Sequence, residues 1–340
     1  MKIQYRIQDN YIEIIRCFGN DPKVVLPESI NGLPVQKVAA YAFSAQKQEE
    51  ETDIAEYETE DAFMAGGGAH LLAAGEIEEI VFPDTVEEIG RYIFYGCKNL
   101  LKLEFSDSLT RIGSGAFTGC GELSHLTVHL YHGKKSCVKE ILGELWQRMD
   151  VTFCNKISYP EERPAVWGTD RRTEGTEIIK LVFPEHYEEA VENTPARILF
   201  TRHHGAGNNY RQCFYGRELD YRKYDSLFPL AAAQDKGEVL ADLVFCRLES
   251  GYGLTDKNRQ MYESYIRENL PQITEYLLDQ DRLEWLQLIS ERRLWSQKVL
   301  DEAIERAAAV GKAEISGYLM DERQSQSGKG PRGKKKRFAL

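Results

Sequence analysis

EEIGRYIFYGCKNL (residues 87–100) and TRIGSGAFTGCGEL (residues 110–123) are two copies of one sequence pattern. At a constant offset of 23 they align Ile89 with Ile112, Gly90 with Gly113, Phe94 with Phe117, Cys97 with Cys120, and Leu100 with Leu123. The offset continues upstream, where Phe82 matches Phe105 and Ile80 matches Leu103. A fixed period in the twenties is typical of a solenoid, in which each turn buries its apolar positions against the next turn.

Each repeat begins with a short stretch in which apolar and polar residues alternate. IVFP (80–83) and LEFS (103–106) predict parallel strands whose alternate side chains point into a common core. Phe94 and Phe117 are expected to stack on each other, and Gly90 and Gly113 to permit a tight bend or a positive φ angle. Six residues are candidates for the outward surface of the strands: Glu79, Val81, Lys102, Glu104, Thr127 and His129.

An earlier turn is visible in VVLPESINGLPVQKVAAYAF (residues 24–43), but an insertion separates it from the regular repeats. The offset from Phe43 to Phe82 is 39, whereas the regular offset from Phe94 to Phe105 is 11. Eight carboxylates fall between residues 49 and 61, and three glycines follow. Self-repulsion and low hydrophobicity predict a disordered acidic insertion over residues 45–75.

Both ends of the repeat array show capping patterns. The opening YRIQDNYIEIIRCFGND (residues 5–21) predicts a hairpin of leading strands. At the other end, residues 137–153 predict a helix with Val138, Ile141, Leu142 and Leu145 on one face, followed by a final strand. Solenoids need such caps because an open end would expose the core.

Two of these phrases resemble a known family. LPESINGLPVQKVAAYAFS (residues 26–44) and FPDTVEEIGRYIFYGCKNLLKLEF (residues 82–105) are similar to bacterial leucine-rich repeats of the BspA-like, surface-antigen type. The resemblance covers roughly residues 1–130 and implies a solenoid that binds protein partners, since surface members of that family adhere to host or matrix proteins. Ile93-Phe94 stands where Ala-Phe is usual.

Residues 159–223 predict a mixed connecting module, with strands at 178–183 and 196–200. The stretch that follows is rich in glycine, arginine and tyrosine. We interpret it as a surface loop, and the alternative is a small-molecule or anion-binding, even catalytic, module centred on residues 202–217. Its candidate ligand residues are Arg202, His203, His204 and Arg211, since guanidinium groups bind anions well.

Residues 224–323 change to helical periodicity. Pro271 is expected to break or kink one helix, and Ser296 to cap another. Leu288-Ile289 and Leu319-Met320 recur at an offset of 31, close to the ankyrin period, so the region resembles an ankyrin-like or generic paired-helix stack.

The tail, residues 324–340, is expected to be disordered and basic. It holds six basic and no acidic side chains, so the net charge of −11 leaves −17 on residues 1–323. A body this acidic is a poor partner for nucleic acid, and a short basic tail alone binds it weakly.

The sequence offers no recognisable catalytic constellation or metal-ligand spacing. Cys97 and Cys120 occupy inward positions, where a thiol is inert. His125 and His129 share one strand face but have no supporting cysteine or carboxylate in sequence. We therefore predict no enzyme activity, no cofactor and no metal.

Seven scattered cysteines without a C-x-x-C pair indicate free thiols, and no run of eighteen apolar residues is present. The charged opening sequence also lacks a secretion-signal pattern. These three observations favour a cytoplasmic location and predict that the chain has no membrane span.

The expected fold class is an α+β repeat protein. We predict a leucine-rich-repeat β-solenoid with parallel strands (1–158), the connecting module (159–223), a helical repeat domain (224–323) and the tail. The function that this organisation favours is a non-catalytic scaffold or adaptor for protein partners.

Overall fold

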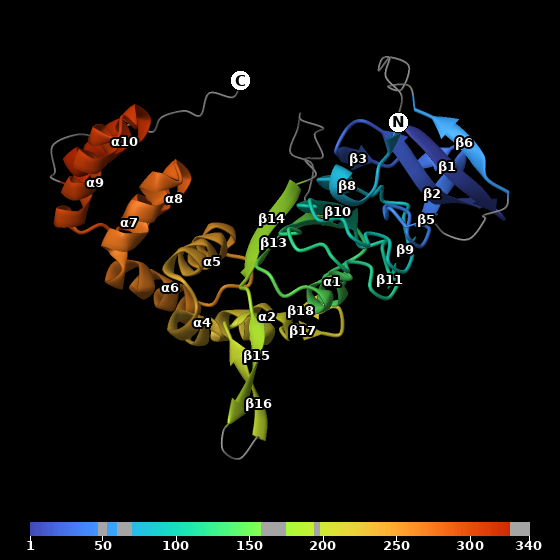
Figure 1. The fold of residues 1–340 in the computed structure, drawn as a ribbon. Coiled ribbons are helices and arrows are strands. Elements are labelled where there is room, and N and C mark those ends of the chain that lie inside the picture. Colours follow the sequence, from blue (N-terminus) through green and yellow to red (C-terminus); the bar gives the residue numbers. More distant parts are fainter. Residues whose placement is uncertain (47–52, 60–69, 158–174, 194–197, 327–340) are drawn as a thin grey trace, which may run out of the picture. The chain divides into compact units, whose positions relative to one another are not determined.

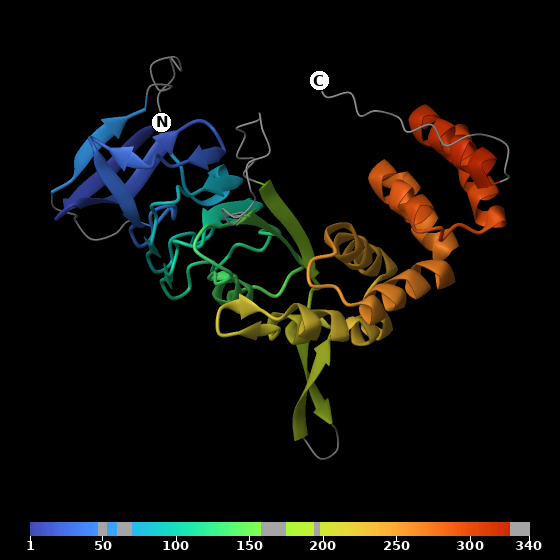
Figure 2. The same cartoon turned by 180° about the vertical axis from the view of Figure 1, so that it is seen from behind.

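The computed structural model describes residues 1–46, 53–59, 70–157, 175–193 and 198–326 (Figures 1 and 2). The chain forms two compact units, residues 1–235 and 236–340. The predicted acidic run between 47 and 52, the glycines at 66–68 and the end of the basic tail lie outside the described residues.

The N-terminal unit contains the predicted parallel-strand solenoid, of about five turns. Successive turns contribute strands to two sheets. The larger sheet runs, in spatial order, β11 (Arg111–Ile112), β9 (Glu88–Ile89), β5 (Leu33–Val38), β2 (Tyr11–Gly19), β1 (Lys2–Gln8) and β6 (Ala55–Glu58), with β4 (Ser29–Ile30) beside β5 and β7 (His70–Leu71) beside β2. The six-stranded sheet runs β14 (Gly175–Phe183), β13 (Met149–Ile157), β12 (His125–Leu130), β10 (Lys102–Ser106), β8 (Glu79–Val81) and β3 (Lys23–Val25).

The register of the parallel strands equals the sequence period. Leu103 pairs with Leu126 on one side and with Ile80 on the other, so identical repeat positions lie side by side. All three side chains are buried, as the alternation predicted. Stacking equal positions builds a continuous apolar core from residues that are only one turn apart in sequence.

An aromatic and thiol column runs through this core. The rings of Phe43, Phe94 and Phe117 lie with centroids 5.6 Å apart at each step. The thiol of Cys97 donates a hydrogen bond to the carbonyl of Phe43 (3.2 Å), and Cys120 repeats the contact to Phe94 (3.3 Å). Burial raises the pKa of Cys97 to about 12, so these thiols join successive turns as neutral donors.

The sequence suggested a tight bend or a positive φ angle at Gly90 and Gly113, and the structure gives another reason for glycine. Neither has a positive φ angle; that conformation occurs at Gly96 and Gly119 instead. A Cβ atom on Gly113 would lie 2.1 Å from the backbone nitrogen of Arg91, and one on Gly90 would lie 2.2 Å from that of Ala40. Glycine is required because two turns touch backbone to backbone at this position.

The insertion is more ordered than predicted. Within residues 45–75, β6 pairs antiparallel with β1, β7 pairs antiparallel with β2, and a short 3-10 helix, η2, covers Ala74–Glu76. Lys2 of β1 forms an ion pair with Glu56 of β6 (2.8 Å), so the N-terminal hairpin binds part of the acidic segment. The prediction of disorder was wrong for both strands, because the open edges of β1 and β2 supply backbone partners that composition does not reveal.

A helix and a strand follow the last repeat, as predicted, and a further strand then extends the sheet. Helix α1 (Val138–Glu144) buries Val138, Ile141 and Leu142, and β13 adds a parallel strand beside β12. β14 then pairs antiparallel with the whole length of β13, so the connecting segment extends the solenoid sheet.

The stretch interpreted as a surface loop contains regular structure. Strands β15 (Tyr187–Asn193) and β16 (Ile198–His204) form a hairpin, visible in Figures 1 and 2, so Arg202 to His204 belong to a strand. The remaining elements of the unit are α2 (Gly207–Arg211), β17 (Phe214–Tyr215), β18 (Glu218–Leu219), α3 (Tyr221–Ser226) and α4 (Phe228–Gln234).

The C-terminal unit is helical. Its helices are α5 (Gly237–Ser250), α6 (Asp256–Glu268), α7 (Leu270–Asp279), α8 (Leu283–Glu291), α9 (Gln297–Ala309) and α10 (Ala313–Gln326). Pro271 lies in the first turn of α7, immediately after α6 ends, and the Ser296 hydroxyl accepts a hydrogen bond from the amide of Val299 (3.4 Å). Both signals therefore confirm the predicted boundaries.

Helices α7–α8 and α9–α10 repeat one turn geometry. Asp281 and Gly311, at an offset of 30 in the sequence, both have positive φ. The amide of Arg282 donates to the Leu277 carbonyl, and Lys312 donates to Ala307 at the same offset. The turn after α8 has the same form, with Arg293 at positive φ and the Leu294 amide donating to the Ile289 carbonyl. The offset of 30 is one residue shorter than the offset of 31 seen in the sequence, and this turn does not by itself mark an ankyrin-like pair.

We predict that Gly113→Ala destabilises the solenoid by about 3 kcal/mol or more, because the added methyl group would enter the backbone of the preceding turn. Chemical denaturation followed by circular dichroism measures the loss. Gly121→Ala is the matched control, since nothing lies within 4 Å of its Cβ position. Equal effects of the two substitutions would contradict the close-approach explanation.

Candidate protein-binding surface

The outward face of the six-stranded sheet gathers all six predicted surface residues. Strand register sets one row of Glu79, Lys102 and His125 across β8, β10 and β12, and a second row of Val81, Glu104 and Thr127. His129 lies two residues further along β12. Their side chains are exposed or half-buried, while the residues between them are buried. The parallel register therefore assembles one surface from residues that are distant in sequence.

Ion pairs and hydrogen bonds order this face. Lys23 Nζ lies 2.7 Å from Glu79 Oε1, and Glu104 Oε1 lies 2.8 Å from His129 Nε2. The hydrogen bond to Glu79 raises the pKa of Lys23. Because these pairs are solvated, each contributes little to stability. Their effect is to present both charge signs at fixed positions.

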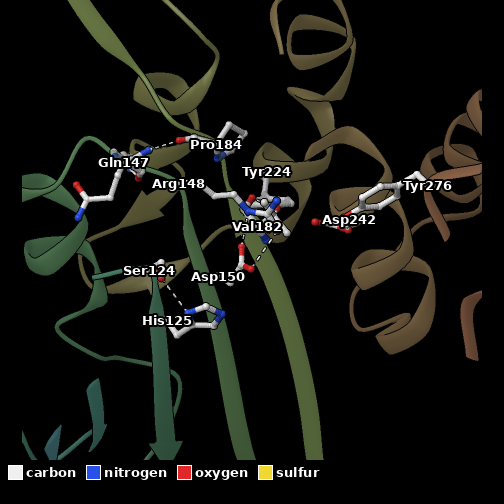
Figure 3. Close-up of polar contacts among 11 residues, drawn as sticks. Ser124, His125, Gln147, Arg148, Asp150, Val182, Pro184, Tyr224, Asp242 and Tyr276 are labelled. Atoms are coloured by element: carbon white, nitrogen blue, oxygen red, sulfur yellow. Dashed lines mark hydrogen bonds and ion pairs between the residues drawn. The ribbon is translucent and has the colours of Figure 1, made fainter. Parts of the chain in front are cut away.

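The same face continues onto β13. The Arg148 guanidinium binds both carboxylate oxygens of Asp150, at 2.8 and 3.0 Å, and Ser124 Oγ lies 3.0 Å from His125 Nδ1 (Figure 3). A bidentate pair of this kind holds both side chains in one orientation.

Tyr131 extends the surface at the carboxyl end of β12. Its ring stacks on His129 with centroids 5.9 Å apart, and Lys156 Nζ lies 5.0 Å from the ring centroid. Burial and the neighbouring carboxylate of Asp84 raise the Tyr131 pKa to about 12. Sequence reasoning missed this residue, although continuing the alternation His125, Thr127, His129 by one step reaches it.

Arg211, a predicted anion ligand, has a structural role. It is 7% exposed, and its guanidinium donates to five backbone carbonyls at 2.6 to 3.1 Å. These acceptors belong to Leu142, Leu145, Gln147, Pro184 and Gly207. Burial lowers the Arg211 pKa to about 10. Its donors join the end of α1 to the end of β14, so none is directed at an anion.

The other three predicted ligand residues lie on the β15–β16 hairpin. Arg202 faces Glu189 in the strand register. His203 Nδ1 lies 3.3 Å from Glu188, and His204 Nε2 lies 3.0 Å from Glu189 and stacks on Tyr187. The structure thus sets each of these residues beside a carboxylate and does not bring the four candidates together. Acidic neighbours disfavour an anion at this position.

Within the described part of the chain, no group of three or more His, Cys, Asp or Glu side chains lies close enough together to bind a metal ion. His129 contacts Glu104, but His125 contacts Ser124. None of the described helices has the length and apolar character that a bilayer crossing requires.

Comparison with known families identifies the repeat. Residues 69–158 match the BspA type leucine rich repeat region in six copies. This part of the solenoid is a leucine-rich repeat region. The match confirms the resemblance seen in residues 82–105. It begins later and ends later than the predicted range of residues 1–130, and it does not reach the helical unit.

Two solved leucine-rich repeat structures are similar to the chain over limited stretches. A leucine rich cell surface protein from Faecalibacterium prausnitzii A2-165 is 21% identical, with a TM-score of 0.26 over 38% of this chain and 35% of that one. A T. pallidum leucine rich repeat protein is 26% identical, with a TM-score of 0.20 over 37% of this chain and 68% of that one. This chain therefore spans about a third of the Faecalibacterium protein. No curated protein matches the sequence.

We predict that Arg211→Met lowers the free energy of unfolding by about 3 kcal/mol or more, because several buried carbonyls lose a charged donor. Urea denaturation measures the change. Arg202→Met is the control for loss of an arginine, and we expect an effect within about 0.5 kcal/mol at that exposed site. A small effect at Arg211 would show that its hydrogen bonds are dispensable.

Cys154 lies on the outward face beside His129, and it is the one cysteine of seven that is not buried. Partial burial raises its pKa. We predict that a disulfide reagent labels one thiol in the folded protein, and that labelling accelerates as the pH rises toward this raised pKa. Cys154→Ser should abolish the labelling; labelling that survives this substitution would contradict the assignment.

Proposed function

We propose that this chain is a non-catalytic scaffold or adaptor that binds protein partners through the outward face of the six-stranded sheet. The observation that carries the proposal is the register of β8, β10 and β12. It fixes charged and small side chains in rows on one face, while the alternate side chains are locked in the core. Solenoids commonly use such extended surfaces for recognition.

The chemistry of the face supports a protein partner. Glu79, Lys102 and Glu104 alternate in sign along neighbouring strands, and Tyr131 adds an aromatic group of the kind enriched at interfaces. Mixed charges at fixed positions favour a partner with a complementary pattern. A uniformly basic surface, which nucleic acid would require, is absent from the described rows of this face.

The helical unit is proposed as a second recognition surface, of ankyrin-like type. The support is the packing of the helix pair α9–α10 against the pair α7–α8, through α9 and α7. Arg306 joins the second pair to the first through Glu275 and Asp279, as expected for stacked units.

A cytoplasmic location is also proposed. All seven cysteines are free, and thiols of this number persist most readily in a reducing compartment. Fractionation of source cells, followed by detection of the chain with an antibody, tests this location directly.

We predict that Glu104→Arg combined with Thr127→Arg abolishes partner capture, because the pair introduces two cations at the centre of the face. Full-length protein would serve as bait in lysate of the source cell, with captured proteins identified by mass spectrometry. Thr118→Arg with Glu122→Arg makes the same two exchanges at exposed positions of one repeat, away from the face.

A partner that binds the wild type and the control variant, but not the face variant, supports the proposed surface. A partner retained by both variants places recognition elsewhere. If no partner is captured by any of the three proteins, the adaptor proposal fails.

A further inference from the structure

The outer edge of β14 is a second exposed feature of the six-stranded sheet, separate from the proposed partner-binding face. β14 is the terminal strand of the six-stranded sheet, and all nine of its residues pair with β13 without a bulge. No strand of the described residues lies on its other side. A long, regular edge of this kind is a template for pairing with another strand, and natural proteins usually interrupt it.

Tyr224 shows which residues of β14 direct their backbone groups outward. Its hydroxyl accepts from the amide of Val182 (3.2 Å) and donates to the carbonyl of the same residue (2.5 Å), as Figure 3 shows. In an antiparallel pair the outward groups recur at every second residue. The outward positions are therefore Thr176, Ile178, Lys180 and Val182, and Tyr224 closes the edge at the last of them.

Ile178 lies near the middle of β14, between the outward positions Thr176 and Lys180. Its side chain is 53% exposed, whereas the next apolar residues, Ile179 and Leu181, are each 1% exposed. Val182 is also 1% exposed, although it shares the alternation of Ile178, because α3 packs Tyr224 against the strand there. An exposed isoleucine near the middle of the terminal strand of a sheet is the arrangement that strand addition would bury.

The sequence of this edge is complementary to itself. Antiparallel pairing about Ile178 would set Ile178 opposite Ile178, Thr176 opposite Lys180, and Glu177 opposite Ile179. No pair brings like charges together, and the central pair is apolar, which favours the ladder. An axis at Lys180 would instead place two ammonium groups face to face and would require the backbone of Val182, which Tyr224 already occupies.

We propose that two copies of this chain associate through their β14 edges, with a two-fold axis at Ile178 and one continuous sheet across both copies. The interface is isologous, the commonest form in symmetric dimers. The inference does not depend on the proposed adaptor function, because the paired surface is the strand edge and the outward sheet face stays open.

The size of the contact sets the expected strength. Five residues on each side bury much less surface than the roughly 1,600 Å² of a standard stable interface. Association should therefore be weak and concentration-dependent, with the dissociation constant in the range of about 10 to 100 µM. At lower concentrations the protein should have its monomer mass of 38.9 kDa.

Sedimentation equilibrium of the full chain tests the proposal. The apparent mass should rise from one copy toward two as the concentration increases through this range. Ile178→Lys should weaken dimerisation at least about tenfold, since it places like charges opposite each other. Ile178→Pro should act similarly, because the lost amide points outward and the pairing with β13 keeps its hydrogen bonds.

Ile7→Lys is the matched control, an isoleucine of 55% exposure on β1, in the other sheet. Circular dichroism and thermal midpoints close to wild type would establish that each variant folds. A mass of one copy at every concentration would overturn the proposal. So would a dimer that persists in both Ile178 variants, or one that Ile7→Lys also removes.

Discussion

The close contact of backbone with backbone between successive turns is the constraint on which the solenoid depends. At Gly90 and Gly113 there is no room for a Cβ atom, so neighbouring turns lie as near to each other as peptide groups allow. This spacing brings the phenylalanine rings into a 5.6 Å stack and the cysteine thiols within reach of carbonyls one turn away. The same spacing fixes the parallel register, and the register builds the outward face.

The periodic part of the fold could be predicted from sequence because every turn meets an equivalent neighbour. A single constant offset implied the strand register, the buried column and the six outward residues. The role of Gly113 was predicted only in part, since a repeated glycine signals a backbone requirement without saying whether it is a positive φ or a close contact.

The non-periodic parts were harder, because their structure depends on partners that are distant in sequence. Ala55–Glu58 is acidic and has the composition of a loop, yet it forms a strand because β1 offers an open edge. Arg211 has the character of an anion ligand, yet five carbonyls from segments up to 69 residues away surround it. Tyr131 was within reach of the alternation, whereas its contact with Lys156 depends on a strand that only the fold brings alongside.

The direction of the sheet hydrogen bonds has a mechanical consequence. They run between turns and therefore along the axis of the array, so a load applied along that axis would be resisted by the two ladders that join one turn to the next. Each turn that detached would release one period of the chain, roughly 80 Å when fully extended. The antiparallel ladder of β13 and β14 lies at the end of this series. It joins nine residue pairs, against five between β10 and β12, and would therefore resist such extension more strongly.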